Sequence, residues 1–437
     1  MSKKNRPYYE EELIKTSPLN RLSFLTPRDI QSFITVVLLL FFAGALQAQN
    51  VDPLIKKDSR GQKIWVDSVM KSMSIDQKIG QLFMIPAYSN KDAKHTAEID
   101  SLISEYGIGG LVFFQGTPEK QVKMTNHFQT NSKIPLLIAI DGEWGLDMRL
   151  DNTYRFPWNM TLGAIQDDKL IEAFGKKLGQ HAKRIGIHVN FAPVVDVNIN
   201  PKNPIIGNRS FGEDPKNVAQ KAIAFTKGIQ SENVLANAKH FPGHGDTDVD
   251  SHLALPTIPF TKERLDSIEL YPYKKLFETG LASVMVAHLS VPALEPNSSL
   301  PSSLSKDIVT NLLKEKMGFE GLIFTDALNM KGAANFSSAS EINLEVLKAG
   351  NDVLLMPHDI PESFAKIQQA IKDSVITEAR LNESVKKILK AKYWAGLRVF
   401  KPLKEESISR DLNTAENKAL HEELVKNSLT LLKNEKK

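Results

Sequence analysis

Short apolar runs alternate with amphipathic segments from about residue 60 to residue 400. Eight runs are apolar almost throughout and are expected to be strands: residues 82–87, 108–114, 134–141, 187–197, 234–241, 283–289, 321–328 and 352–357. Other segments carry apolar residues at helical spacing and are expected to be helices: residues 64–81, 167–186, 214–230, 261–280 and 341–350. Apolar strands that alternate with amphipathic helices are typical of a parallel sheet covered by helices.

The number of strand–helix units favours an α/β fold of the (β/α)8 TIM-barrel type over residues 60–400. A doubly wound open sheet is the alternative. In a barrel, the active site is built where the strands end and the following loops begin. A polar residue at the end of one strand is often only a turn former or a helix cap. Here several strands end in polar residues, which favours a functional site in that layer: Asp141, Asp196, Lys239, His240, His288 and Asp326.

The N-terminal part of the chain differs from this pattern. Residues 1–32 are polar and net basic, and residues 33–46 (FITVVLLLFFAGAL) are apolar. This run is shorter than the roughly 20 residues of a membrane-spanning helix and fits the core of a signal peptide. We therefore expect residues 1–50 to be an N-terminal extension with a signal peptide or an uncleaved membrane anchor; a buried helix is the third alternative. Either of the first two implies an exported protein, periplasmic or membrane-anchored and facing the periplasm.

After residue 400 the alternation weakens. A helical stretch at about 414–427 is followed by a strand-like run, SLTLLKN, at residues 428–434. We expect residues 401–437 to be a linker and the truncated start of a second domain, of which this run is the first strand.

The composition excludes several classes of function. The 437 residues are 42% hydrophobic and 24% charged, as in an ordinary soluble globular protein. The net charge of +4 comes from basic residues interleaved with acidic ones, so no nucleic-acid partner is expected. The absence of cysteine excludes disulfides, thiolate zinc sites and a catalytic thiol.

The densest cluster of titratable residues is Lys239–His252, KHFPGHGDTDVDSH, with three histidines, three aspartates and one lysine. A metal site, a proton-transfer site and a plain polar loop are the three interpretations. The alternating aspartates resemble the start of a calcium loop, but its glycine and its closing glutamate are lacking. The pair His240 and His244 does not stand on a helix, because Pro242 interrupts it. We therefore expect no metal.

Proton transfer is supported by Asp250 and His252, which stand two residues apart. Residues at that spacing project to the same side of an extended segment, and a carboxylate beside an imidazole orients it as a general acid or base. A surface loop is the alternative. With no cysteine and no GxSxG motif, a carboxylate is the natural nucleophile, and Asp326 ends the seventh expected strand. This pairing suggests cleavage of a glycosidic bond with retention.

Four segments, in this order, resemble glycoside hydrolase family 3 and, within it, the NagZ-like β-N-acetylglucosaminidase branch. The resemblance covers about residues 62–400 and rests on these segments: IDGEWGLDMR (140–149), GNRSFGEDP (207–215), KHFPGHGDTDVDSH (239–252) and GLIFTDALNM (321–330). It implies a (β/α)8 barrel, no metal or other cofactor, and a covalent glycosyl-aspartate. By position, Asp326 resembles the nucleophile, His252 the general acid/base and Asp250 its orienting partner. The resemblance also implies a set of sugar-binding residues: Asp141, Arg149, Arg209, Lys239 and His240.

The function implied by the resemblance is exo-acting release of terminal β-linked N-acetylglucosamine. Peptidoglycan fragments, as in peptidoglycan recycling, or chitin-type oligosaccharides would be the substrates. A phosphorylase that uses phosphate as acceptor is one alternative, and a non-catalytic sugar-binding protein inactivated by truncation is another. The sequence departs from the branch at Ala327, which follows Asp326, and at Trp144 and Gly145, which follow Glu143. We expect those departures to bear on the detailed specificity.

Overall fold

The computed structural model describes residues 52–249 and 254–433. The expected signal peptide or anchor at residues 33–46 therefore lies outside the described residues, and so do Asp250 and His252. Within the described ranges, no helix combines the length and the apolar character needed to cross a membrane.

The described residues form one sheet of eight strands in which every paired neighbour is parallel. The strands are β1 (Phe83–Tyr88), β2 (Gly110–Phe114), β3 (Leu137–Ile140), β4 (Val189–Asn190), β5 (Leu235–Phe241), β6 (Ser283–Val286), β7 (Leu322–Thr325) and β8 (Leu354–Leu355). Each lies within or overlaps one of the eight expected runs. The sheet order is β7-β6-β5-β4-β3-β2-β1-β8, so adjacent strands of the sheet are consecutive in the sequence, except for the pair β1 and β8.

The sheet closes on itself. Strand β8 pairs with β1 through Leu354 opposite Phe83. On its other side, β8 meets β7 through a parallel bridge between Phe324 and Val353, and the Thr325 N–H donates to the Val353 carbonyl at 3.0 Å. A doubly wound sheet would leave two open edges. The closure therefore confirms the (β/α)8 barrel.

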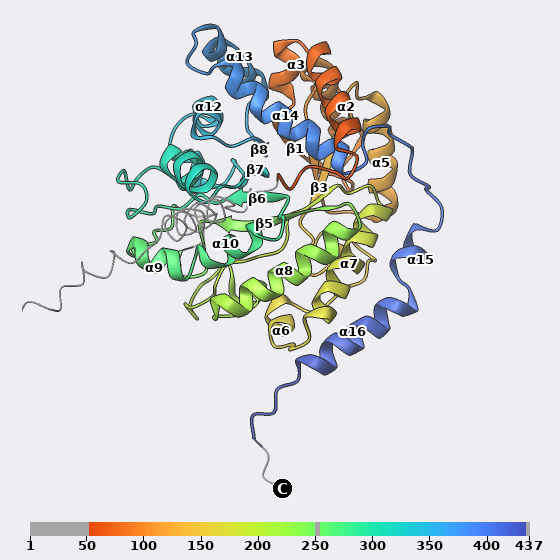
Figure 1. Cartoon of the computed structure of the whole chain (residues 1–437). Coiled ribbons are helices and arrows are strands. Elements are labelled where there is room, and N and C mark those ends of the chain that lie inside the picture. The colour runs from red at the N-terminus through yellow and green to blue at the C-terminus, as the bar shows by residue number, and fades with distance from the viewer. Residues whose placement is uncertain (1–51, 250–253, 434–437) are drawn as a thin grey trace, which may run out of the picture. The chain divides into compact units, whose positions relative to one another are not determined.

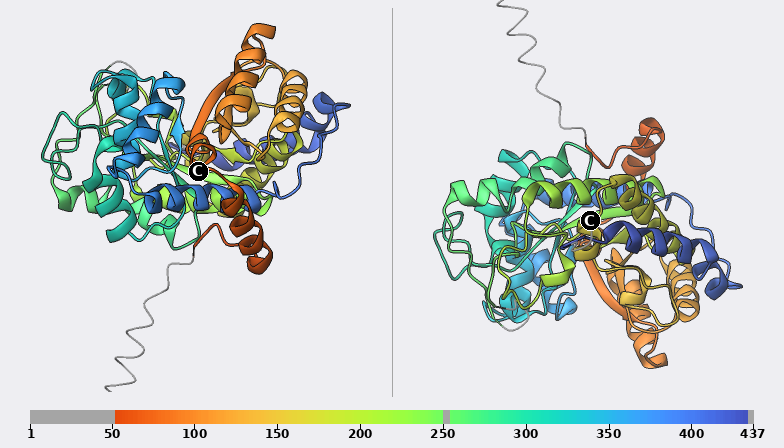
Figure 2. Two further views of the ribbon diagram at one scale, coloured as in Figure 1. Left: turned by 90° about the horizontal axis from the view of Figure 1, so that it is seen from above. Right: turned by 90° about the horizontal axis from the view of Figure 1, so that it is seen from below.

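Helices surround the strands, as Figures 1 and 2 show. The longer ones are α2 (Ser59–Ser72), α4 (Ala93–Tyr106), α5 (Pro118–Asn131), α7 (Asp168–Arg184), α8 (Pro215–Ser231), η5 (Asp307–Lys316), α12 (Ala339–Ala349), α13 (Ile360–Lys372) and α14 (Glu378–Trp394). The shorter ones are α3 (Ile75–Gly80), α6 (Asn159–Gly163), α9 (Lys262–Ser267), α10 (Tyr271–Phe277), α11 (Lys331–Ala334) and the 3-10 turns η2 (Leu146–Met148), η3 (Gly207–Arg209) and η4 (Ser302–Leu304).

Two expected helices are each split in two. The segment 64–81 becomes α2 and α3, because Ser74 starts a new helix with a capping box in which it exchanges hydrogen bonds with Gln77. The segment 261–280 becomes α9 and α10, with Pro272 in the first turn of the second helix. The apolar periodicity continued across both breaks, so it did not reveal them.

The chain continues past the barrel with α15 (Ile408–Leu412) and α16 (Ala415–Ser428), and α16 packs against α6 and α7. The strand expected at residues 428–434 is wrong for the described part of that run, because residues 429–433 form no strand. Leu429, Leu431 and Leu432 are 78%, 77% and 92% exposed. A strand needs a partner, and β-propensity alone does not form one. That residues 401–437 begin a second domain stays a prediction.

Candidate active site

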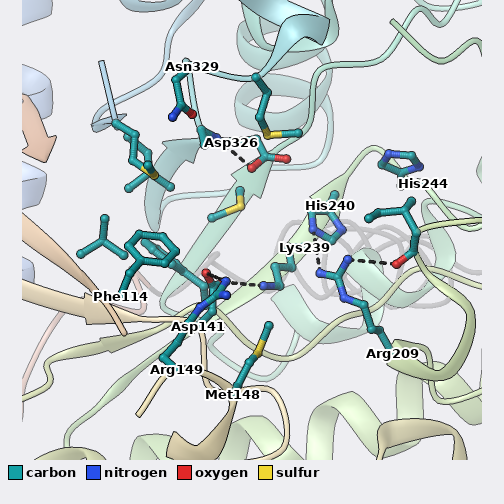
Figure 3. A pocket seen from close by; sticks show the side chains of 18 residues that line it. Phe114, Asp141, Met148, Arg149, Arg209, Lys239, His240, His244, Asp326 and Asn329 are labelled. Carbon is teal, nitrogen blue, oxygen red and sulfur yellow. Dashed lines mark hydrogen bonds and ion pairs between the residues drawn. The ribbon is translucent and has the colours of Figure 1, made fainter. Parts of the chain in front are cut away.

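A cavity of about 450 Å³ lies at the C-terminal ends of the strands. Polar and charged residues from four strand ends line it: Asp141, Arg149, Arg209, Lys239, His240, His244, Asp326 and Asn329. Phe114 and Phe191 and several methionines line its apolar parts. Figure 3 shows Asp326 on one side of the cavity and Asp141, Lys239 and Arg149 on the other. The cavity therefore stands where a barrel places its chemistry.

A chain of alternating charges forms one wall. Arg149 Nη2 donates to Asp141 Oδ2 at 2.5 Å, and Lys239 Nζ donates to Asp141 Oδ1 at 2.8 Å. The same Lys239 Nζ lies 2.9 Å from Glu143 Oε1. Arg209 completes the chain, with Nε 3.0 Å from Glu143 Oε2 and Nη2 2.8 Å from Glu143 Oε1. Three cations thus share two carboxylates.

These ion pairs keep both carboxylates ionised although they are buried. Burial alone would raise the pKa of Asp141, but Lys239 and Arg149 more than offset it and hold that pKa well below its usual range. Burial likewise works against the ionised form of Glu143, yet Arg209 and Lys239 lower its pKa to about 2. The wall therefore stays charged at neutral pH and presents fixed hydrogen-bonding groups to a polar ligand.

Asp196 orients His240, which lies in β5, and His244, which follows that strand. Its Oδ2 lies 2.7 Å from His240 Nδ1, and its Oδ1 accepts from the backbone N–H of His244 at 2.7 Å. Burial raises the pKa of Asp196, but His240 outweighs burial and the pKa falls below its ordinary value. Because an ionised carboxylate only accepts, His240 carries a proton on Nδ1. The other ring nitrogen, Nε2, lies 3.4 Å from Arg209 Nη2, which points a donor at it.

The segment after β5 packs tightly against the segment after β4. His244 Nδ1 lies 2.7 Å from Thr247 Oγ1, and Asn203 Nδ2 donates to the His244 carbonyl at 2.8 Å. A Cβ atom on Gly245 would stand 2.0 Å from the Val197 carbonyl oxygen, so a glycine is required for this close approach. The stem of the loop that continues toward His252 is therefore fixed at the edge of the cavity.

Asp326 follows β7 directly. Its backbone N–H donates to the Val286 carbonyl at 2.8 Å, and its Oδ1 accepts from the Ala327 N–H at 2.8 Å. Burial raises the pKa of this carboxyl, but nearby His240, the Ala327 N–H and Lys239 outweigh burial and lower it. Asp326 is therefore an ionised, oriented carboxylate in the cavity, as a nucleophile requires.

Comparison with known proteins identifies the family. The family model described as "Glycosyl hydrolase family 3 N terminal domain" matches residues 74–391. The chain belongs to glycosyl hydrolase family 3. The expected resemblance is thereby confirmed. Over the described parts of the chain, no group of three or more His, Asp or Glu residues is arranged to hold a metal ion.

Individual members of family 3 are similar over most of the chain. "Beta-hexosaminidase A" of Pseudoalteromonas piscicida is 33% identical over 327 residues, which are 68% of this chain and 55% of that protein. A solved glycoside hydrolase family 3 β-N-acetylglucosaminidase from Paenibacillus sp. str. FPU-7 is 34% identical with a TM-score of 0.77, covering 84% of this chain and 71% of that one. The "Beta-glucoside phosphorylase BglX" bound to 2FGlc is 26% identical with a TM-score of 0.81, covering 87% of this chain and 69% of that one. The chain thus spans little more than half the length of the first of these.

The family 3 barrel brings most of the residues predicted from sequence into one cavity. These are Asp141, Arg149, Arg209, Lys239, His240 and Asp326. The remaining two, Asp250 and His252, fall outside the described residues, and their roles stay predictions. Sequence reasoning did not assign roles to Glu143 and Asp196. Glu143 stands two residues after Asp141 in the same segment, and Asp196 is the polar residue that follows the fourth strand, so both carried a signal.

Proposed function

We propose that this chain is a retaining, exo-acting glycoside hydrolase that releases terminal β-linked N-acetylglucosamine. The hexosaminidase and N-acetylglucosaminidase names of its relatives support the sugar. The observation that carries the reaction type is Asp326, a buried and ionised carboxylate that faces the charged wall of Asp141, Lys239 and Arg149 across one cavity. Peptidoglycan fragments or chitin-type oligosaccharides are the proposed sources of the sugar.

The proposed reaction proceeds in two steps. Asp326 attacks the anomeric carbon and forms a glycosyl-aspartate, while the leaving oxygen takes a proton. His252, oriented by Asp250, supplies that proton and then removes one from the water that hydrolyses the intermediate. The roles of this pair rest on the sequence motif. The structure contributes the stem that leads to it, because His244 and Thr247 are anchored at the edge of the cavity.

The charged wall is proposed to bind the hydroxyl groups of the terminal sugar. Asp141 offers acceptors, Arg149 and Lys239 offer donors, and His240 and Arg209 extend the set. Positive charge develops on the sugar ring in the transition state, and hydrogen bonds to charged groups are stronger than neutral ones. Because these groups are already paired with one another, they need no reorganisation when the charge develops.

The test is hydrolysis of 4-nitrophenyl β-N-acetylglucosaminide by the chain and by two variants. Asp326→Ala should lose at least about a thousandfold of the activity, since the nucleophile is gone. His252→Ala should lose less with this leaving group, because nitrophenolate departs without a proton. The matching β-glucoside serves as the specificity control. Undiminished turnover by Asp326→Ala, or no turnover by the parent chain, would overturn the proposal; sugar binding without turnover would then favour a binding protein.

A phosphorylase is the second candidate, and the similarity to the β-glucoside phosphorylase favours it. The two activities differ in the acceptor that attacks the glycosyl-aspartate. Product analysis with and without inorganic phosphate separates them. Free N-acetylglucosamine at an unchanged rate supports the hydrolase, whereas a phosphate-dependent rate with a sugar 1-phosphate as product supports the phosphorylase.

We also propose that the chain is exported, on the basis of the apolar run 33–46. Cell fractionation should recover it with the periplasm or the membrane. N-terminal sequencing of the recovered protein then distinguishes a cleaved signal peptide from a retained anchor, and recovery from the cytoplasm with an intact N-terminus would refute export.

A further inference from the structure

His288 is buried behind the loop that carries Asp326. It follows β6 by two residues and has no exposed surface. Its Nδ1 lies 2.7 Å from Ser303 Oγ, and its Nε2 lies 3.2 Å from the Ala327 carbonyl oxygen. A carbonyl oxygen only accepts hydrogen bonds, so Nε2 must carry the proton and donate. The ring therefore joins Ser303 to the residue that follows Asp326.

Ala327 is held through both of its backbone groups. Its N–H donates to Asp326 Oδ1 at 2.8 Å. Its carbonyl oxygen accepts from His288 and also from the Met330 N–H, at 3.0 Å, so both lone pairs are used. The turn that begins at Asp326 is thereby fixed, and Asn329 and Met330 of the same turn also line the cavity.

We propose that His288 is the positioning residue of the nucleophile. It holds the Ala327 carbonyl, so the Ala327 N–H keeps one carboxylate oxygen of Asp326 in place and the other turned to the sugar. The inference rests on the proposed role of Asp326. Ser303, by donating to Nδ1, selects the tautomer that His288 needs.

The neutral ring acts on Asp326 through the turn, because its Nε2 proton is donated to the Ala327 carbonyl. A displacement of the reacting atom by about 1 Å costs roughly a hundredfold in rate, which sets the effect expected on removing the ring.

The kinetic test compares His288→Leu and His288→Gln in the full chain. The substrate is 2,4-dinitrophenyl β-N-acetylglucosaminide, whose leaving group needs no acid, so Asp250 and His252 do not enter the first step. We expect His288→Leu to lower kcat/KM by about a hundredfold, while the inhibition constant of free N-acetylglucosamine stays near that of the parent. His288→Gln should recover about tenfold or more, because its amide N–H can reach the Ala327 carbonyl.

Three results would overturn the proposal: a fully active His288→Leu, equal losses in the two variants, or a loss of sugar binding parallel to the loss of rate. Asp326→Ala in the same assay distinguishes a failure of the proposed nucleophile from a failure of the role proposed for His288. If Asp326→Ala remains active, the proposed nucleophile is wrong. If it is inactive and His288→Leu is not, only the inference about His288 fails.

A measurement that needs no activity tests the geometry itself. Nuclear magnetic resonance of histidine-selectively ¹⁵N-labelled protein, with the His288 signals assigned by their loss in His288→Gln, reports which ring nitrogen carries the proton. We expect the proton on Nε2 and a shift of the Nδ1 resonance in Ser303→Ala. A neutral ring protonated on Nδ1 alone, or no response to Ser303→Ala, would refute the proposal even if the parent chain turned over no substrate.

Discussion

Glu143→Gln removes one charge from the middle of the buried wall. The parent carboxylate accepts from Arg209 through two nitrogens and from Lys239. In the variant both cations stay buried, but Lys239 keeps only Asp141 as an anionic partner and Arg209 loses the carboxylate with which it is paired. The pKa of Glu143 falls from 4.5 to about 2 on folding, although burial opposes this, because Arg209 and Lys239 stabilise the charged form. At about 1.4 kcal/mol for each unit of pKa, this lowering of the Glu143 pKa corresponds to roughly 3 kcal/mol in the free energy of unfolding.

We expect the free energy of unfolding to drop by about 3 kcal/mol at pH 7, within the range for breaking a buried ion pair. Urea titration followed by fluorescence measures it, since urea adds no ionic strength. The folded pKa is depressed, so the contribution is fully present above pH 4.5 and is lost as pH falls toward 2. The difference between parent and variant should therefore be constant from pH 5 to pH 8 and shrink below pH 4.5.

The matched control is Glu278→Gln, which removes the same charge from an exposed ion pair with Lys275. The Glu278 side chain is 62% exposed and that of Lys275 is 41% exposed. It should leave the urea midpoint nearly unchanged. A loss below about 1 kcal/mol for Glu143→Gln at pH 7, or equal effects of the two variants, would refute the reasoning that the charged wall is a buried, stabilising network.

Three further predictions concern other buried groups. Asp196→Asn should lower kcat/KM about a hundredfold or more, because an amide can donate to His240 Nδ1 and so move the ring proton to Nε2. The control Asp246→Asn should change kcat/KM little. Burial lowers the pKa of Lys392 to about 7, so the charged side chain destabilises the fold fully below pH 7, and this cost falls as pH rises toward 10.5. In urea titrations, Lys392→Met should therefore raise the free energy of unfolding by about 2–3 kcal/mol more at pH 6 than at pH 9. Burial lowers the pKa of His188 to about 3, so the free energy of unfolding of the parent falls as pH drops below 6.5. His188→Asn should reduce this pH dependence by about 1.4 kcal/mol per pH unit. An unchanged pH dependence would contradict the prediction.

The barrel could be predicted from sequence because its strands are buried on both faces. An apolar run of strand length between amphipathic helices has few other interpretations, and all eight runs contain strands. Their lengths could not be predicted. In the run 187–197 only Val189–Asn190 form a strand, because regular pairing with β5 stops after Asn190. It returns as a single parallel bridge between Val194 and Lys239, in which the Val195 N–H donates to the Lys239 carbonyl. Apolar character continues across that change and does not report it.

The site could be predicted in part for a related reason. Polar residues that end strands are visible in the sequence, and Asp141, Lys239, His240 and Asp326 were found this way. Their partners were not visible, because the pairing of Glu143 with Arg209 depends on where the loops after β3 and β4 meet in space. The exposed leucines after α16 show the opposite error, since strand-like composition predicted a strand that has no partner within the described residues.

Trapping the intermediate is the most direct test of the central claim, that Asp326 forms a covalent bond to N-acetylglucosamine. The chain is incubated with a mechanism-based fluorinated N-acetylglucosaminide, and intact-mass spectrometry is followed by peptide mapping. We predict one added sugar per chain, carried by the peptide that contains Asp326 and absent in Asp326→Ala. A label on another residue, or turnover of the chromogenic substrate with no covalent species under any trapping condition, would contradict the claim.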